Sequence, residues 1–126
     1  MAIKISGAEL DIMNVLWQSG DTQAGLAASD VHARLANDKG WTSRTVKTLL
    51  ARLVEKGALT TEPDGRRYLY KTAISETDYK TKAAGQFVDR IFAGRAAPLV
   101  AHLADSRGLS EADISELEKL LGELKK

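Results

Sequence analysis

The chain contains no cysteine, and that absence excludes several kinds of function. Disulfide bonds, thiolate metal sites and cysteine nucleophiles all need a sulfhydryl group. The two histidines, His32 and His102, stand far apart in the sequence without a partner motif. We therefore expect no metal site and no cofactor.

Long apolar runs are also missing. No stretch approaches the roughly 18 consecutive apolar residues of a membrane-spanning helix, and residues 1–10, MAIKISGAEL, lack the apolar core of a secretory signal. The length of 126 residues, with 44% hydrophobic and 28% charged residues, is typical of a folded globular chain. We expect a soluble cytoplasmic protein without a membrane partner.

Recognisable catalytic motifs are absent as well. The sequence has no G-x-S-x-G, no H-E-x-x-H, no Walker phosphate loop and no G-x-G-x-x-G. Its carboxylates fall at expected helix starts, where they cap the helix or complement its dipole. We predict no catalytic residue and no enzymatic activity.

The net charge of +1 conceals an uneven distribution. Between Lys39 and Lys71, eight lysines and arginines face three acidic residues, which leaves this segment at +5. From Ala73 to Lys126, eight cations and nine anions give −1. Positive charge is therefore concentrated in the middle of the chain, where it can meet a polyanion.

Two helices are predicted before this basic segment. Ser6 and Glu9 form a capping box, and apolar residues then follow at helical spacing up to the expected stop at Gly20: Leu10, Met13, Leu16 and Trp17. After a loop of small residues, Ser29 is expected to cap a short second helix with Val31 and Leu35 facing inward.

A third helix is predicted within residues 41–57, WTSRTVKTLLARLVEKG. One face is apolar at 3.6 residues per turn: Val46, Leu49, Leu50, Leu53 and Val54. Thr42 or Ser43 can cap its start, and Gly57 can supply a left-handed stop. The first two turns outside the apolar face carry hydroxyls and cations, with a further arginine on the flank: Ser43, Arg44, Thr45, Lys47, Thr48 and Arg52.

The segment after Gly57, ALTTEPDGRRYLYKT, is predicted to form a β-hairpin around Pro63-Asp64-Gly65. Arg66 and Arg67 would lie at its tip. Tyr68 and Tyr70 share one face, and we expect both to pack under the hairpin. A helix-turn-helix followed by a basic hairpin is the outline of a winged helix.

Residues 74–126 are predicted to form three further helices with apolar faces. Ser75 and Ser110 begin two of them as caps, Gly94 ends the first, and Pro98 suits the first turn of the next. Fewer than about 70 residues rarely bury such faces alone. They either fold back on the winged helix or pair with a second copy, and we favour a homodimer held by these side chains: Tyr79, Phe87, Ile91, Leu99, Leu103, Ile114, Leu117, Leu121 and Leu124.

The fold class expected is therefore mainly α with a small β-hairpin: a winged helix-turn-helix over residues 1–73 and a helical dimerisation domain over residues 74–126. The major groove of DNA admits one α-helix, whose first turns can meet base edges. We assign Arg44, Thr45 and Thr48 to base contacts, and Ser43 and Lys47 to phosphate or base contacts, and we expect Arg52 to contact DNA as well. Arg66 and Arg67 would reach phosphates or a minor groove.

The segments GAELDIMNVLW, WTSRTVKTLLARLVEKGALTTEPDGRRYLY and AISETDYK resemble the penicillinase-repressor family of bacterial transcription factors. Thr45 to Leu59 is the most specific part of a match that covers nearly the whole chain. The resemblance implies a winged helix, a helical dimerisation domain, and a homodimer that represses transcription from a palindromic double-stranded DNA operator.

Two features of the family are missing here. Its β-lactam-responsive members are inactivated by cleavage of an Asn-Phe bond, and the corresponding place in this chain is Ala101-His102. Its copper-responsive members carry paired cysteines near the C-terminus, and this chain has none. The resemblance therefore identifies no inducing signal.

Two other hypotheses remain open at the level of sequence. The winged helix could be a protein-interaction module without DNA contact, although the +5 segment argues against it. Alternatively, a DNA-binding regulator could sense a small ligand in a pocket between its two domains. Salt-dependent duplex binding and ligand-induced thermal stabilisation would separate these hypotheses.

Overall fold

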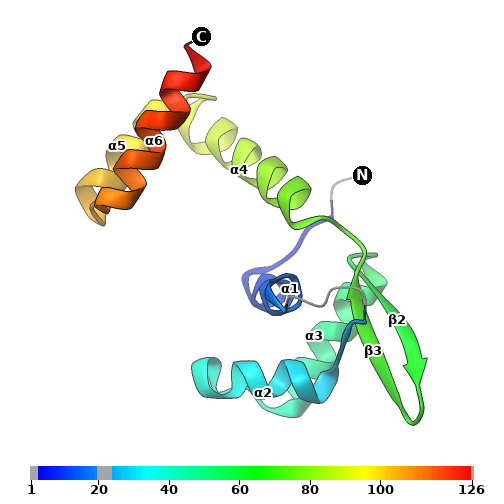
Figure 1. Ribbon diagram of the computed structural model, residues 1–126. Helices are drawn as coiled ribbons and strands as arrows, with labels where there is room; N and C mark the ends of the chain where they lie inside the picture. The colour runs from blue at the N-terminus through cyan, green and yellow to red at the C-terminus, as the bar shows by residue number, and fades with distance from the viewer. Residues whose placement is uncertain (1–2, 20–23, 126) are drawn as a thin grey trace. The chain divides into compact units, whose positions relative to one another are not determined.

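The computed structural model describes residues 3–19 and 24–125 and divides the chain into two compact units between Tyr79 and Lys80. The first unit holds α1 (Gly7–Gln18), β1 (Leu26–Ala27), α2 (Ala28–Lys39), α3 (Ser43–Glu55), β2 (Leu59–Asp64), β3 (Arg67–Thr72) and the start of α4 (Glu76–Phe92) (Figure 1). The second holds the remainder of α4, α5 (Ala96–Ser106) and α6 (Glu111–Leu124). The division lies after Tyr79, not before α4, because the Tyr79 ring lies 6.0 Å from the Trp17 ring of α1.

Helices α1, α2 and α3 pack around a common core. Its buried side chains are Ile12, Met13 and Leu16 from α1, Val31 and Leu35 from α2, and Val46, Leu49, Leu50 and Leu53 from α3. The inward faces predicted for α2 and α3 are confirmed by this burial. Each such side chain contributes about 1.5–3 kcal/mol when it is fully buried, so the core fixes how α3 is rotated about its own axis.

The ends of α1 and α3 follow the predicted capping chemistry. Ser6 and Glu9 form a capping box, in which the Glu9 amide donates to Ser6 Oγ at 3.2 Å and the Ser6 amide donates to Glu9 Oε1 at 2.8 Å. Thr42 caps α3 by accepting from the Thr45 amide at 3.2 Å. Gly57 follows α3 with φ +84°, a left-handed conformation that glycine adopts without steric cost. Gly20, the expected stop of α1, lies outside the described residues.

The prediction that Ser29 caps α2 is wrong. The helix begins at Ala28, and its N-cap is Ala27, whose amide donates to Asp30 Oδ2 at 3.1 Å. The Asp30 carboxylate satisfies this backbone donor from inside the first turn, so the helix starts without a capping hydroxyl.

The sheet has three antiparallel strands in the order β1-β3-β2. The sequence predicted only the hairpin, because β1 has two residues and no alternating pattern. β1 lies close to β3 at Gly25, where a side-chain Cβ would stand 2.8 Å from the Tyr70 carbonyl oxygen. Glycine at this position therefore permits the third strand.

The predicted turn at Pro63-Asp64-Gly65 is also wrong in its position. Pro63 pairs with Tyr68 and Asp64 pairs with Arg67, so the two turn residues are Gly65 and Arg66. Gly65 has φ +65°, which suits a two-residue hairpin loop. Pro63 is tolerated in β2 because β2 is an edge strand.

An ion pair between a buried carboxylate and a partly exposed lysine joins the start of α1 to the end of α3. Lys56 Nζ lies 2.5 Å from Glu9 Oε1 and donates to the Lys4 carbonyl oxygen at 2.7 Å. The Glu9 side chain is 2% exposed. Burial alone would raise the pKa of the Glu9 carboxyl, but hydrogen bonds from Lys56 and Ser6 and the charge of Lys56 outweigh it and hold this pKa below 4.5.

The second unit has no buried residue among those described. α4 ends at two successive left-handed residues, Ala93 with φ 52° and Gly94 with φ 81°, and the Gly94 amide donates to the Val88 carbonyl at 3.1 Å. Ser110 caps α6 by accepting from the Asp113 amide at 3.0 Å, as predicted. The local structure of this unit is therefore well specified although six of its large apolar side chains are exposed.

We predict that Lys56→Met destabilises the winged helix by about 2 kcal/mol or more, because Glu9 then stays buried without its cation. The measurement is chemical denaturation at pH 7. Arg52→Met is the matched control, since Arg52 is an exposed cation on the same helix without an ion-pair partner among the described residues, and its loss should change stability by less than about 0.5 kcal/mol. Equal effects of the two substitutions would contradict the role given to Lys56.

The same pair sets a pH dependence whose sign follows from the direction of the Glu9 shift. Because the pKa of Glu9 is lower in the folded state than its ordinary value of 4.5, its ionised form stabilises the fold above that value. This contribution is lost as the pH falls through the folded pKa. Denaturation curves collected below pH 5 should therefore show a steeper loss of stability for the native protein than for Glu9→Gln.

Candidate nucleic-acid interface

The face of α3 opposite the core is exposed along its whole length. The side chains at this face are those predicted from the sequence: Ser43, Arg44, Thr45, Lys47, Thr48 and Arg52. Between them, Val46, Leu49 and Leu50 point into the core and are at most 6% exposed. Because these apolar side chains pack against α1 and α2, the polar face of α3 is held outward.

Two threonines on this face make local hydrogen bonds that leave part of each hydroxyl available. Thr45 Oγ1 accepts from Thr42 Oγ1 at 3.2 Å, which leaves the Thr45 hydroxyl hydrogen to donate elsewhere. Thr48 Oγ1 donates to the Arg44 carbonyl at 3.0 Å, which leaves its lone pairs to accept. The two side chains therefore present opposite hydrogen-bonding characters to an incoming ligand.

Four of the eight cations in the basic segment are neutralised within the first unit. The pairs are Lys39 with Asp11 at 3.6 Å, Lys56 with Glu9 at 2.5 Å, Arg67 with Asp64 at 3.1 Å and Lys71 with Glu62 at 2.6 Å. Within the described ranges, the other four have no ion-pair partner: Arg44, Lys47, Arg52 and Arg66. Three of these lie on the exposed face of α3, and one lies in the hairpin turn.

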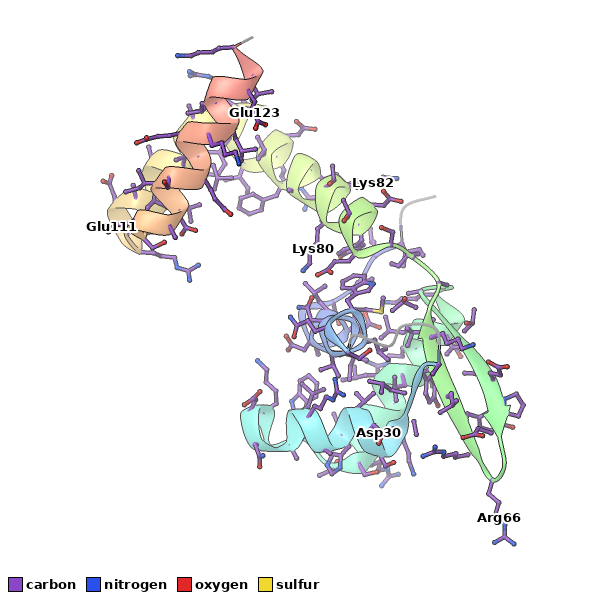
Figure 2. All side chains as sticks on the ribbon, viewed as in Figure 1. Asp30, Arg66, Lys80, Lys82, Glu111 and Glu123 are labelled. Carbon is purple, nitrogen blue, oxygen red and sulfur yellow. The ribbon has the colours of Figure 1, made fainter. Side chains whose placement is uncertain are left out.

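Arg66 and Arg67 differ although they are adjacent in sequence. Arg66 lies in the turn, and Figure 2 shows its side chain projecting beyond the sheet. Arg67 is the first residue of β3 and pairs with Asp64 directly beside the turn, so both arginines lie at the tip of the hairpin but only Arg66 lies in the turn itself. Its guanidinium Nε contacts Asp64 Oδ2 across the two strands. The strand register therefore pairs Arg67 with Asp64 and leaves Arg66 in the turn.

The end at which α3 begins and the hairpin turn lie toward the same end of the first unit (Figure 1). In Figure 1, β2 and β3 run away from the end of α3, and their turn lies toward the end at which α3 begins. The unpaired cations of the two elements can therefore face a single extended anion.

Sequence reasoning missed the separation of the basic segment into paired and unpaired cations, because the partners of Lys56 and Lys71 depend on tertiary packing and strand register.

The predicted pairing residues fall into three groups. Tyr79 belongs to the first unit, where it contacts Trp17. Leu99, Leu103 and Leu117 are half-buried within the second unit. The remainder are exposed there, together with Leu120, which the sequence analysis did not single out: Phe87, Ile91, Ile114, Leu121 and Leu124.

The two histidines have structural neighbours. A ring nitrogen of His32 lies 3.0 Å from the Trp41 carbonyl oxygen, and the His102 ring lies 5.6 Å from the Phe92 ring. Among residues 3–19 and 24–125, no group of three or more histidine, aspartate or glutamate side chains could hold a metal ion. No helix in the described part of the chain is long and apolar enough to cross a membrane.

Comparison with known proteins gives a consistent result. The sequence pattern of the family described as penicillinase repressor matches residues 5–123. The penicillinase repressor of Bacillus licheniformis is 32% identical over 122 residues, covering 97% of this chain and 92% of that protein. The methicillin resistance regulatory protein MecI of Staphylococcus aureus is 28% identical over 118 residues, covering 94% and 93% respectively.

The solved structures agree on the first unit. The solution structure of the Bacillus licheniformis BlaI monomeric form in complex with the blaP half-operator is 34% identical, with a TM-score of 0.51. It covers 63% of this chain and 92% of that chain. The predicted mainly helical winged helix-turn-helix followed by C-terminal helices is confirmed, with a three-stranded sheet in place of the hairpin. The chain belongs to the penicillinase repressor family of DNA-binding transcriptional repressors, which are not enzymes.

Proposed function

We propose that this repressor binds a palindromic DNA operator as a homodimer, with one α3 helix in each of two major grooves. The observation that carries the proposal is the position of the unpaired cations. Arg44, Lys47 and Arg52 lie on the exposed face of α3 and Arg66 lies in the hairpin turn, whereas the neighbouring cations are neutralised by acids. An arrangement of this kind matches a groove with a phosphate backbone on either side.

Base contacts are assigned to the first two turns of α3. Arg44 can donate two hydrogen bonds to a guanine, and Thr45 and Thr48 offer a donor and an acceptor at the same end of the helix. Ser43 and Lys47 are suited to phosphate as well as to base edges, and Arg52, further along, is suited to phosphate.

We expect the wing, the hairpin of β2 and β3, to contact the phosphate backbone or an adjacent minor groove. Arg66 makes this contact directly. Arg67 contributes less, because the Asp64 carboxylate already neutralises its guanidinium.

The structure of BlaI with operator DNA supports DNA binding by analogy. That protein is in complex with the blaP half-operator as a monomer, and the match covers 63% of the present chain. A single unit of the present chain would then contact one half-site. Because a bacterial repressor meets its DNA operator in the cytoplasm, we place the protein there.

The second unit is suited to pair with the same unit of a second copy of the chain. This unit has no buried residue among those described, and six large apolar side chains are 42–80% exposed: Phe87, Ile91, Ile114, Leu120, Leu121 and Leu124. Exposed apolar surface of this extent on α4 and α6 favours association. In a symmetric dimer the same surface serves both copies, and the two recognition helices then fit half-sites related by a twofold axis, about 10 base pairs apart or somewhat more.

Sequence-specific DNA binding is tested by selecting bound duplexes from a random pool. We expect enrichment of an inverted repeat, whereas recovery of unrelated sequences would contradict the proposal. Arg44→Ala should weaken binding to the selected duplex by about 1–3 kcal/mol and relax the preference at one base pair of each half-site. Arg107→Ala is the control, since Arg107 is an exposed cation of the second unit and should change neither quantity.

The two wing arginines provide an internal comparison. Arg66→Ala should weaken binding to all duplexes alike and reduce the dependence of log K on log salt by about 1 per site. Arg67→Ala should have a smaller effect on both quantities because its charge is already paired. Titrations at several salt concentrations measure both. A larger salt effect of Arg67→Ala would contradict the assignment of the free cation.

Association through the apolar surface is tested by placing a charge on it. Leu121→Glu should convert the protein to a monomer in sedimentation equilibrium and weaken binding to the full operator far more than to a half-site. Ser115→Glu adds the same charge to α6 roughly opposite the apolar stripe and should leave the dimer intact. If native protein sediments as a monomer at concentrations that saturate the operator, the homodimer is excluded.

A further inference from the structure

The hairpin carries one large aromatic side chain that the core does not use. Tyr68 lies in β3 close to the turn and is 57% exposed, so the expectation that it packs under the hairpin is wrong. Tyr70, two residues along on the same face, packs against the core. The face of the hairpin that covers the helices therefore continues beyond the core toward the turn, and Tyr68 occupies that extension.

The partner of Tyr68 across the ladder is Pro63, which is also exposed. Directly opposed residues of antiparallel strands share a face, so the two rings form an uncharged surface that ends in a phenol hydroxyl. The other face of the hairpin is different. There, Arg67 is paired with Asp64 and Lys71 with Glu62.

The hairpin thus has a charge-neutralised outer face and an uncharged helix-side face, with the unpaired cation Arg66 between them in the turn. A duplex held by α3 lies on the helix side of the sheet. The helix-side face near the turn would then approach the sugar–phosphate backbone next to the groove that α3 enters. The sugar–phosphate backbone presents apolar deoxyribose edges and anionic phosphate oxygens.

We propose that Tyr68, supported by Pro63, is a backbone-contacting and positioning residue of the DNA interface, an inference that rests on the function proposed above. The ring packs on a deoxyribose, and the phenol O–H donates to a phosphate oxygen of double-stranded DNA. Tyrosine hydroxyls are among the donors that fix the register of a protein on a duplex. The contact limits how Arg66 approaches the DNA, because both residues belong to the same end of the hairpin.

The first test compares two substitutions on the selected duplex. Tyr68→Phe removes the hydroxyl alone and should weaken binding about tenfold, the loss of one hydrogen bond to a charged group. Tyr68→Ser removes the ring as well and should weaken it further. Thr60→Ala is the matched control, since Thr60 is exposed on the opposite face of the same hairpin and should leave affinity unchanged.

The second test asks whether the hydroxyl meets a phosphate. Duplexes with one neutral methylphosphonate at each position in turn should identify a phosphate outside the α3 groove whose neutralisation weakens binding of the native protein. At that position the loss should disappear in Tyr68→Phe, because each change removes the same interaction. A structural role of Tyr68 would instead give additive losses and a lower melting temperature, whereas Tyr68→Phe should melt like the native protein.

The outcomes separate this inference from the proposed function. If the native protein selects no duplex sequence, both fail. If it selects an operator and Arg44→Ala weakens binding, but Tyr68→Phe binds with native affinity and shows no coupling to any phosphate, the proposed function stands and the contact by Tyr68 is excluded.

Discussion

The packing of α3 on α1 and α2 is the constraint on which the rest of the interface depends. Four buried side chains, Val46, Leu49, Leu50 and Leu53, set the rotation of this helix. At about 1.5–3 kcal/mol each, their burial exceeds the 1–3 kcal/mol of a good base contact. Contacts with a DNA duplex are therefore too weak to rotate α3 about its axis. Lys56, bonded to Glu9 and to the Lys4 carbonyl, fixes the far end of the same helix.

The acids of the first unit then decide which cations remain available. Exposed ion pairs such as Arg67 with Asp64 contribute little to stability, at most about 1 kcal/mol. Their effect on recognition is larger, since each removes a positive charge from the surface that DNA would meet. A count of lysines and arginines gives +5 for residues 39–71, whereas the cations without partners among the described residues lie on one helix face and in one turn.

Sequence patterns were sufficient for what depends on neighbours along the chain. The apolar stripe of α3, its cap at Thr42 and its end at Gly57 are set within a few residues and were predicted. One local feature, the start of α2, was also placed wrongly, because the Asp30 carboxylate replaces the expected Ser29 cap. The other errors concern strand pairing and tertiary contacts. The strand β1 exists because β3 accepts it beside Gly25, and the turn moved to Gly65-Arg66 because Pro63 pairs with Tyr68. Likewise, no local pattern marks Lys56 as the partner of the buried Glu9.

The two units differ in the way they obtain stability, and this difference has a consequence for regulation. The winged helix has its own core, whereas the second unit has no buried residue among those described and exposes six large apolar side chains. Under the proposed dimerisation, folding of the second unit and association are linked, so operator occupancy depends on protein concentration as well as on base contacts. Two linked half-site contacts can exceed the affinity of one by several orders of magnitude. A signal that separates the second units would therefore release the operator without touching α3 or the wing.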